Sequence, residues 1–174
     1  MKKRLFFLYI LFNSLAINAQ ETVKWLSFEK AIELNKTNQK QFLVSIYTDW
    51  CGWCKKMDTE TYTNPIIAKY INDNYHAIKL NGEGKEPITF NNYTFKQKKQ
   101  GNIVYHELSA AMLDGKLSYP TTIILNKEVQ LLDRIPGYLT PRKMEMVLAY
   151  FMRKDRDTKN WGDFSKEFIN SIKE

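Results

Sequence analysis

The pattern of hydrophobic and polar residues alternates between helix-like and strand-like segments. Apolar residues at helical spacing follow Ser27, a good N-cap candidate, and predict a helix from about 28 to 34. A nearly continuous apolar run at 41–48, rich in β-branched and aromatic residues, predicts a central strand covered on both faces. A helical pattern then begins at Gly52 and extends to about Tyr62.

The next segments complete a β-α-β unit. Pro65 suits the first position of a new helix, and residues 75–81 then have the composition of a second strand. Later in the chain, 121–125 and 129–135 are short strands joined by a local turn, so we expect them to pair antiparallel. A helix capped at Thr140 follows them.

Residues 82–104 interrupt this regular order. The segment 88–95 is nearly symmetric about Asn91 and Asn92, which tolerate positive φ, so it predicts a small β-hairpin. A helical pattern then covers 105–113. The hairpin could cover a sheet edge or contact a partner.

The first residues form a separate segment. A basic stretch at 2–4 precedes the apolar run 5–17, and a small residue, Ala19, follows. This order is typical of a secretory signal at 1–19, and the run is shorter than the about 20 residues of a transmembrane helix. We therefore expect an exported bacterial protein, periplasmic or extracellular, that meets the membrane only through this signal. An uncleaved anchor is the alternative.

The rest of the 174-residue chain suits one domain. We expect the domain at 20–153, followed at 154–174 by a polar connector and a last helix packed on it. The formal net charge is +7, but three of the 26 basic residues lie in the signal, so the mature chain is only mildly basic. The lysine-rich run 96–99 is interpreted as a solvated loop. We expect no nucleic acid as a partner, and a monomer.

Cys51 and Cys54 are the only cysteines of the chain. A structural zinc site needs four ligands, and the chain adds only His76 and His106, which are far apart in sequence. A disulfide that closes so small a loop stabilises a fold by only roughly 2 kcal/mol in the chain-entropy model. We therefore favour a redox-active dithiol with no metal and no other cofactor, while a metal site and a structural disulfide remain alternatives.

The position of the pair supports redox chemistry. Cys51 would lie at the start of a helix, where the helix dipole favours a thiolate by about 0.3–1 kcal/mol. Cys54, one turn further, is placed to resolve a mixed disulfide. Lys55 adds positive potential or is simply solvated. Trp50 and Trp53 could shield the sulfurs and offer an apolar docking face, although Trp50 could equally belong to the core.

The motif W-C-G-W-C-K at 50–55 resembles the active-site motif of thioredoxin-fold oxidoreductases, particularly exported bacterial disulfide-interchange proteins. The motif S-Y-P-T-T at 118–122 resembles the cis-proline loop of that family. In the family this proline lies beside the dithiol, and the preceding residue offers its backbone to an extended substrate. The resemblance implies these roles for Pro120 and Tyr119, and it extends the substrate-facing set to Trp50, Gly52 and Trp53.

The resemblance covers about residues 25–152. It implies an α/β thioredoxin fold, with a central mixed β-sheet flanked by helices, an inserted hairpin at about 82–104 and an extra C-terminal helix. The implied function is a thiol–disulfide oxidoreductase that exchanges disulfides with protein substrates and with an upstream thiol–disulfide electron partner. A reductase is favoured by analogy. An oxidase or isomerase, a non-catalytic binding module and a metal carrier are the alternatives.

Two departures from the family pattern leave the redox properties open. The family usually has a buried acid six residues before the first cysteine, where this chain has Ser45. That acid assists proton transfer to the inner thiol, so its absence leaves the speed of reduction undecided. The family's lysine on the neighbouring strand is matched by Lys79. The Gly52-Trp53 dipeptide differs from the best-known members, so their potentials do not transfer.

Overall fold

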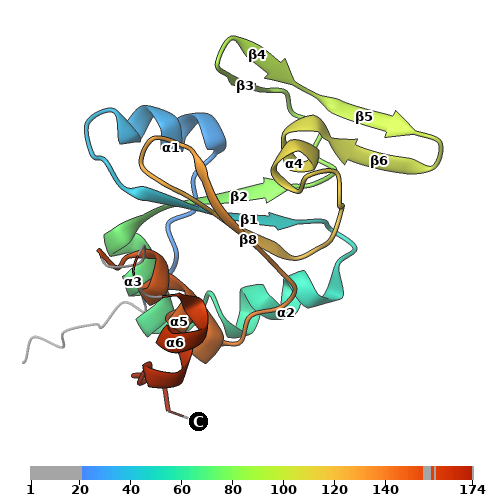
Figure 1. Cartoon of the computed structure of the whole chain (residues 1–174). Coiled ribbons are helices and arrows are strands. Elements are labelled where there is room, and N and C mark those ends of the chain that lie inside the picture. Colours follow the sequence, from blue (N-terminus) through green and yellow to red (C-terminus); the bar gives the residue numbers. More distant parts are fainter. Residues whose placement is uncertain (1–20, 155–157, 159, 174) are drawn as a thin grey trace, which may run out of the picture.

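The computed structural model describes residues 21–154, 158 and 160–173. Within this part of the chain, the central sheet has four strands in the order β2-β1-β7-β8, and Figure 1 shows them between layers of helices. The strands are β1 (Gln41–Tyr47), β2 (Tyr75–Asn81), β7 (Thr121–Leu125) and β8 (Leu131–Pro136). β1 runs parallel to β2, whereas β7 is antiparallel to both of its neighbours. The mixed sheet expected from the sequence is therefore confirmed.

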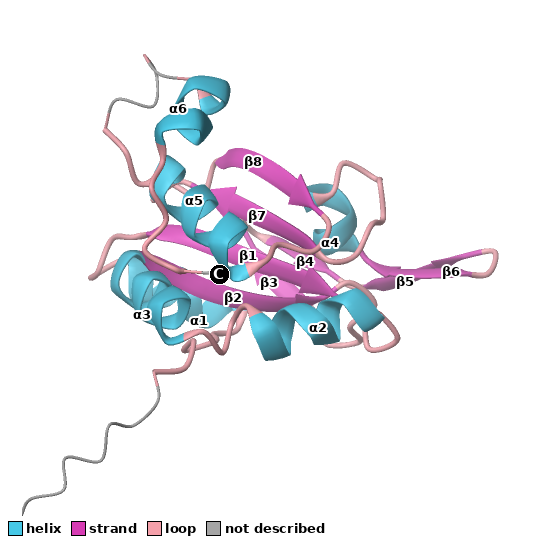
Figure 2. Cartoon of the chain, turned by 90° about the horizontal axis from the view of Figure 1, so that it is seen from below, coloured by secondary structure: helices cyan, strands magenta, loops and turns pink. Residues whose placement is uncertain are grey.

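Helices cover both faces of this sheet (Figures 1 and 2). One face is covered by α1 (Phe28–Asn35) and α4 (Glu107–Met112), and the other by α2 (Gly52–Glu60), α3 (Pro65–Asn74) and α5 (Pro141–Phe151). Along β1, Leu43 belongs to one buried cluster, while Phe42 and Val44 belong to the other. Because side chains of a strand alternate between faces, burial on both sides explains the continuous apolar run.

The predicted helix starts are confirmed by their caps. The side chain of Ser27 accepts from Lys30 N, and that of Thr140 accepts from Lys143 N. The strand predicted at 129–135 begins later, at Leu131. Val129 has a φ of 64° and lies in the turn between β7 and β8, so it cannot continue an extended strand.

The inserted segment forms an arm whose second part projects from the domain (Figure 2), whereas its first part packs with Ile88, Phe90 and Phe95 against the buried cluster beneath α1 and α4. Its first part is the predicted hairpin, β3 (Ile88–Phe90) paired with β4 (Tyr93–Phe95), and Asn91 and Asn92 have φ of 48° and 61°. A second hairpin, β5 (Gln97–Gln100) with β6 (Ile103–His106), was not predicted. The four residues of β5 are all polar or charged, so no hydrophobic pattern in the sequence indicates this strand.

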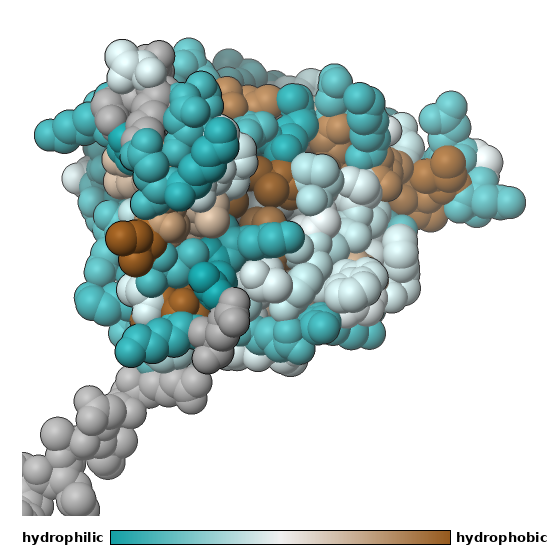
Figure 3. Space-filling view, turned by 60° about the horizontal axis from the view of Figure 1, so that its bottom comes forward, coloured by the Kyte–Doolittle hydropathy of each residue, from teal (hydrophilic) through white to brown (hydrophobic). Residues whose placement is uncertain are grey.

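The second hairpin corrects two expectations. The lysine-rich run at 96–99 lies mostly in strand β5 rather than in a loop. The helix expected from residue 105 begins only at Glu107, because Tyr105 and His106 pair with Lys98 and Gln97 in β6. The space-filling view in Figure 3 shows hydrophobic, brown atoms on the projecting part of the molecule, and Tyr93 and Ile103 of the arm are exposed.

The described C-terminal residues pack against α5. Helix α6 (Trp161–Glu167) places Trp161 and Phe164 against Tyr150, with ring centroids 5.3 Å apart in both cases. The helix ends at Glu167, and Ile172 lies beyond it but still packs on the core. The predicted signal at 1–19 lies outside the described residues, and so does most of the connector at 154–159.

The two histidines predict how stability depends on pH. Burial lowers the pKa of both His76 and His106 below the usual 6.5, so each ring takes up a proton more readily in the unfolded chain than in the folded protein. The free energy of unfolding is therefore expected to fall as the pH is lowered from about 7 to about 5. His106→Asn, which can still cap α4, should flatten this slope in urea titrations. An unchanged slope would contradict the prediction.

Candidate active site

Cys51 lies where the central strand turns into a helix. It is the N-cap of α2, and its Sγ accepts a hydrogen bond from Cys54 N at 3.1 Å. A disulfide joins Cys51 to Cys54, with Cα atoms 5.3 Å apart. Both residues are buried, at 4% and 3% exposure, so in this oxidised form the sulfurs are covered. The strand-to-helix position expected for the pair is what the structure shows.

The loop at 118–120 lies at the same end of the sheet. The peptide bond between Tyr119 and Pro120 is cis. β7 begins directly after it, and the pairing of Thr121 with Ile46 places the loop beside the end of β1 that leads to the cysteines. The Tyr119 ring is edge-on to Trp50, with centroids 5.9 Å apart. Residues from two distant motifs of the sequence are thus neighbours.

Exposed aromatic side chains flank the disulfide. Trp50 is 66% exposed and Trp53 is 59% exposed, so the core alternative for Trp50 is wrong. Trp53 packs on Tyr138 at 5.6 Å between centroids, and Lys56 Nζ lies 5.3 Å from both ring centres. Gly52 and Lys55 are exposed on the first turns of α2. Sequence reasoning missed Tyr138, because it comes from a loop that no motif marks.

Lys79 is half-buried between aromatic rings and a carboxylate of α2. It is paired in register with Ser45, and its ammonium forms an ion pair with Asp58 of α2. The rings of Trp25 and Tyr62 lie 4.9 and 5.3 Å from Lys79 Nζ. The carboxylate partner of this lysine therefore comes from the helix that carries the cysteines, and not from Ser45 on the strand. Nothing in the periodicity of the sequence indicated Asp58.

Tyr62 adds a neutral hydroxyl to this buried region. Burial raises the pKa of Tyr62 to about 12, against the smaller lowering effect of the Ser45 and Thr122 hydroxyls. Ser45 and Thr122 are themselves buried, at 3% and 0% exposure. The position of the family's buried acid is thus occupied by hydroxyl groups that stay uncharged at neutral pH.

The ion pair of Lys79 is expected to contribute measurably to stability. Asp58→Ala leaves a lysine that is only 20% exposed without its carboxylate, so we expect a loss of about 1–3 kcal/mol in the free energy of unfolding. The matched control is Asp73→Ala, which breaks an exposed pair with Lys69 and should leave the free energy of unfolding almost unchanged, because solvent screens this pair. Urea unfolding measures both. Equal losses would contradict the prediction.

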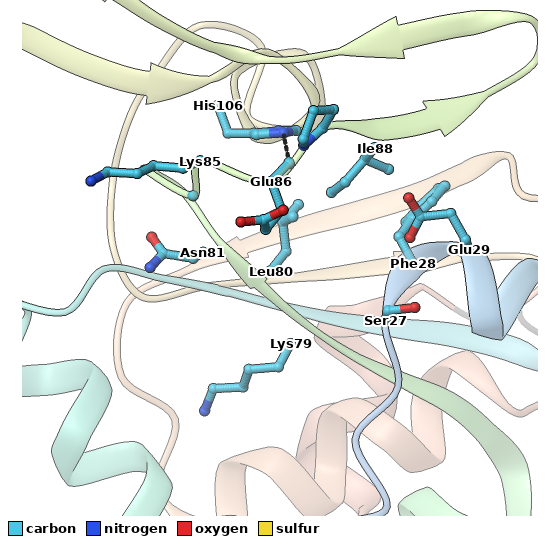
Figure 4. Close-up of a pocket in the computed structure, with 12 residues that line it drawn as sticks. Ser27, Phe28, Glu29, Lys79, Leu80, Asn81, Lys85, Glu86, Ile88 and His106 are labelled. Carbon is cyan, nitrogen blue, oxygen red and sulfur yellow. Dashed lines mark hydrogen bonds between the residues drawn. The ribbon is translucent and has the colours of Figure 1, made fainter.

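A separate cavity lies away from the cysteines, between the start of α1 and the root of the arm (Figure 4). It measures about 480 Å³. Lys79 points away from it, on the other side of β2 from His106. His106 is held by the Glu86 carbonyl at Nε2 and by Leu108 N at Nδ1. Among the described residues, no group of three or more His, Cys, Asp or Glu is placed to hold a metal ion.

A disulfide-forming C-x-x-C pair at the start of a helix, beside a cis X-Pro loop on a mixed sheet, defines a thioredoxin-fold protein with a dithiol site. The chain belongs to the family Thioredox_DsbH, described as "Protein of unknown function, DUF255", whose model matches residues 12–153. None of the helices within the described residues has the length and apolar character needed to cross a membrane.

Several solved structures share the fold. A thioredoxin from Thermus thermophilus has a TM-score of 0.56 at 12% identity, with 78% of this chain and 90% of the other covered. A thioredoxin-fold protein from Helicobacter pylori has a TM-score of 0.55 at 19% identity, covering 74% and 80%. A putative disulphide-isomerase from Bacteroides thetaiotaomicron has a TM-score of 0.52 at 20% identity, covering 80% and 97%. The predicted thioredoxin fold is therefore confirmed.

One curated relative is similar in sequence. The "Uncharacterized protein B0495.5" of Caenorhabditis elegans is 31% identical over 72 residues, which are 41% of this chain. The match spans only 10% of that protein, so the chain corresponds to a small part of this relative.

Proposed function

We propose that the protein is an exported thiol–disulfide oxidoreductase that reduces disulfides of protein substrates. The observation that carries the proposal is the Cys51–Cys54 disulfide at the N-terminus of α2, beside the Tyr119-Pro120 loop. The basic and apolar pattern of the first residues supports export. Trp50, Gly52, Trp53, Tyr119 and Pro120 are the proposed substrate-facing residues.

The chemistry is a two-electron exchange. In the reduced protein, the Cys51 thiolate attacks one sulfur of the substrate disulfide, and the other sulfur leaves as a thiolate. Cys54, once deprotonated, attacks Cys51 Sγ and releases the second substrate thiolate, which forms the internal disulfide seen here. The substrate gains two electrons and the dithiol loses two. An upstream dithiol protein then restores the reduced pair by the same steps in reverse.

The geometry at Cys51 favours the attacking species. The backbone N–H of Cys54 points at Cys51 Sγ, and an N–H at the positive end of a helix stabilises a negative charge on that sulfur. Lys55, exposed on the first turn of α2, adds positive potential nearby. Cys54 lies one turn further along α2 and is bonded to Cys51 in the oxidised form, so it is the residue placed to resolve the mixed disulfide.

Trapping of mixed disulfides tests the proposal. In Cys54→Ala, Cys51 can attack a substrate, but nothing resolves the adduct, so we expect covalent complexes on non-reducing gels of the native compartment. The control Cys51→Ala/Cys54→Ala should form none. An absence of trapped partners would contradict a substrate-facing enzyme. Full biological activity of a Cys51→Ser/Cys54→Ser variant would instead favour a binding module.

The direction of exchange is tested by the reduction potential of the pair. A reductase requires a potential toward the thioredoxin value of about −270 mV, while a strong oxidase lies near about −120 mV. Equilibration of the Cys51–Cys54 pair with glutathione buffers measures the value. A result near the oxidase end would overturn the reductase assignment and keep the exchange chemistry.

A further inference from the structure

The root of the inserted arm contacts the exposed tryptophan beside Cys51. The indole Nε1 of Trp50 donates to the carboxylate of Glu83, at 3.0 and 3.1 Å from its two oxygens. Glu83 lies just after β2, where the chain enters the insertion. The bond restrains a side chain that is otherwise 66% exposed. A hydrogen bond to a charged acceptor is stronger than a neutral one.

Gly82, the residue before Glu83, packs against the ring of Tyr119. A Cβ at Gly82 would overlap Cε1 of Tyr119 and lie 2.6 Å from its Oη, so only glycine lets the ring approach this closely. Burial, and then the charge of Glu83, raise the pKa of Tyr119. The dipeptide 82–83 therefore contacts both aromatic residues, because Glu83 accepts from Trp50 and Gly82 leaves room for the Tyr119 ring. Together these residues form one cluster.

Backbone contacts hold this dipeptide in place between the sheet and the arm. Gly82 N donates to the Tyr47 carbonyl at 2.7 Å, and the Gly82 carbonyl accepts from His106 N at 2.6 Å. The Glu83 carbonyl accepts from Gln97 Nε2 at 2.6 Å. The backbone that carries the Glu83 carboxylate is thus hydrogen-bonded to β1 on one side and to both strands of the second hairpin on the other.

We propose that Glu83 is a positioning residue that determines substrate selectivity, by holding the Trp50 indole edge-on to Tyr119 so that its exposed face receives a large apolar side chain next to the substrate cysteine. The proposal rests on the proposed function and adds the substrate class to it: polypeptide disulfides in which an aromatic or large aliphatic residue adjoins the cysteine. The insertion then acts on the site through its root, Gly82 and Glu83.

The test compares two disulfide-linked peptide dimers, Gly-Phe-Cys-Gly and Gly-Ser-Cys-Gly, reduced in single turnover by the pre-reduced full chain. The unmodified protein is expected to favour the Phe peptide roughly 10-fold through a lower half-saturating concentration. Glu83→Ala should raise that concentration about 5-fold for the Phe peptide only, with the limiting rate within about twofold. Glu83→Gln, which keeps an acceptor oxygen, and the distant control Glu128→Ala should retain the preference.

A second readout reports the contact without any exchange chemistry. The chain has four tryptophans, so its indole N–H groups give at most four nitrogen-15 correlation peaks, and Trp50→Phe identifies one of them. Glu83→Ala should shift that peak strongly and Glu83→Gln weakly. A Gly-Phe-Ser-Gly peptide, which cannot exchange, should perturb the same peak. Gly82→Ala, which forces the Tyr119 ring to move, should also reduce the Phe preference.

The outcomes separate this inference from the proposed function. If the unmodified protein reduces neither peptide, the proposed function fails. Perturbation of the Trp50 peak by Gly-Phe-Ser-Gly would then still support binding of an apolar side chain at Trp50. If both peptides are reduced with no preference, or if Glu83→Ala keeps the preference, the role of Glu83 is overturned and the oxidoreductase stands. Equal losses in Glu83→Gln and Glu83→Ala would also overturn it, because the acceptor oxygen would then not matter.

Discussion

Replacing Cys51 by serine is expected to abolish disulfide exchange, with a loss of at least about 1,000-fold in the single-turnover rate. A serine hydroxyl is not ionised near neutral pH and is a far weaker nucleophile than a thiolate. The N–H of Cys54 that now points at Cys51 Sγ would face a neutral oxygen. Reduction of a protein disulfide by the pre-reduced variant, followed by release of substrate thiols, measures the effect.

Cys54→Ser is the matched control for this prediction. It removes the other half of the same disulfide and so causes the same loss of the covalent bridge. Because Cys51 still attacks, this variant should release one substrate thiol per protein and stop at the mixed disulfide. A Cys51→Ser protein that kept more than about a tenth of the rate would contradict the assignment of Cys51 as the attacking residue.

Ile123→Ala is expected to lower the free energy of unfolding by about 2–5 kcal/mol. Ile123 is 0% exposed on β7 and belongs to the buried cluster beneath α1 and α4. Truncation removes apolar contacts and leaves a cavity. β7 cannot shift to close this cavity, because it is hydrogen-bonded to β1 on one side and to β8 on the other. Urea unfolding of the oxidised protein measures the change.

The control uses the same substitution at an exposed site. Ile169 is 90% exposed, so Ile169→Ala should change the free energy of unfolding by no more than about 0.5 kcal/mol. The denaturant slope should stay the same in both variants, since neither alters the surface exposed on unfolding by much. A similar loss at both positions would show that burial of Ile123 does not determine its contribution.

Elements with a strong local signal were predicted well from the sequence. The bounds of β2 at 75–81 and of β7 at 121–125 agree with the structure. The turn at Asn91 and Asn92 was predicted because asparagine tolerates positive φ. In contrast, β5 carries no apolar residue and is formed by backbone pairing with β6, so its existence depends on a partner strand and not on its own pattern.

The residues of the candidate site likewise fall into two groups, those predicted from a motif and those found only from their contacts in the structure. The cysteine pair and the proline loop are short motifs, and the structure brings them to one end of the sheet through the antiparallel pairing of β7 with β1. Asp58 and Glu83 carry no motif, and their roles come from contacts with Lys79 and Trp50 across the fold. From the sequence alone, a carboxylate on a helix or in a loop is expected to be solvated, because its tertiary neighbours are not known.

By itself, the sequence predicted the kind of chemistry that we propose, because a cysteine pair at a strand-to-helix turn places a sulfur at the start of a helix whatever surrounds it. It also determined the two-sided burial of the central strand. Only the tertiary structure decided which carboxylate meets Lys79, which residue holds Trp50, and that the insertion is attached to the site through Gly82 and Glu83. Those contacts join residues far apart along the chain, and hydrophobic periodicity, which reports only local structure and burial, carries no information about such pairs.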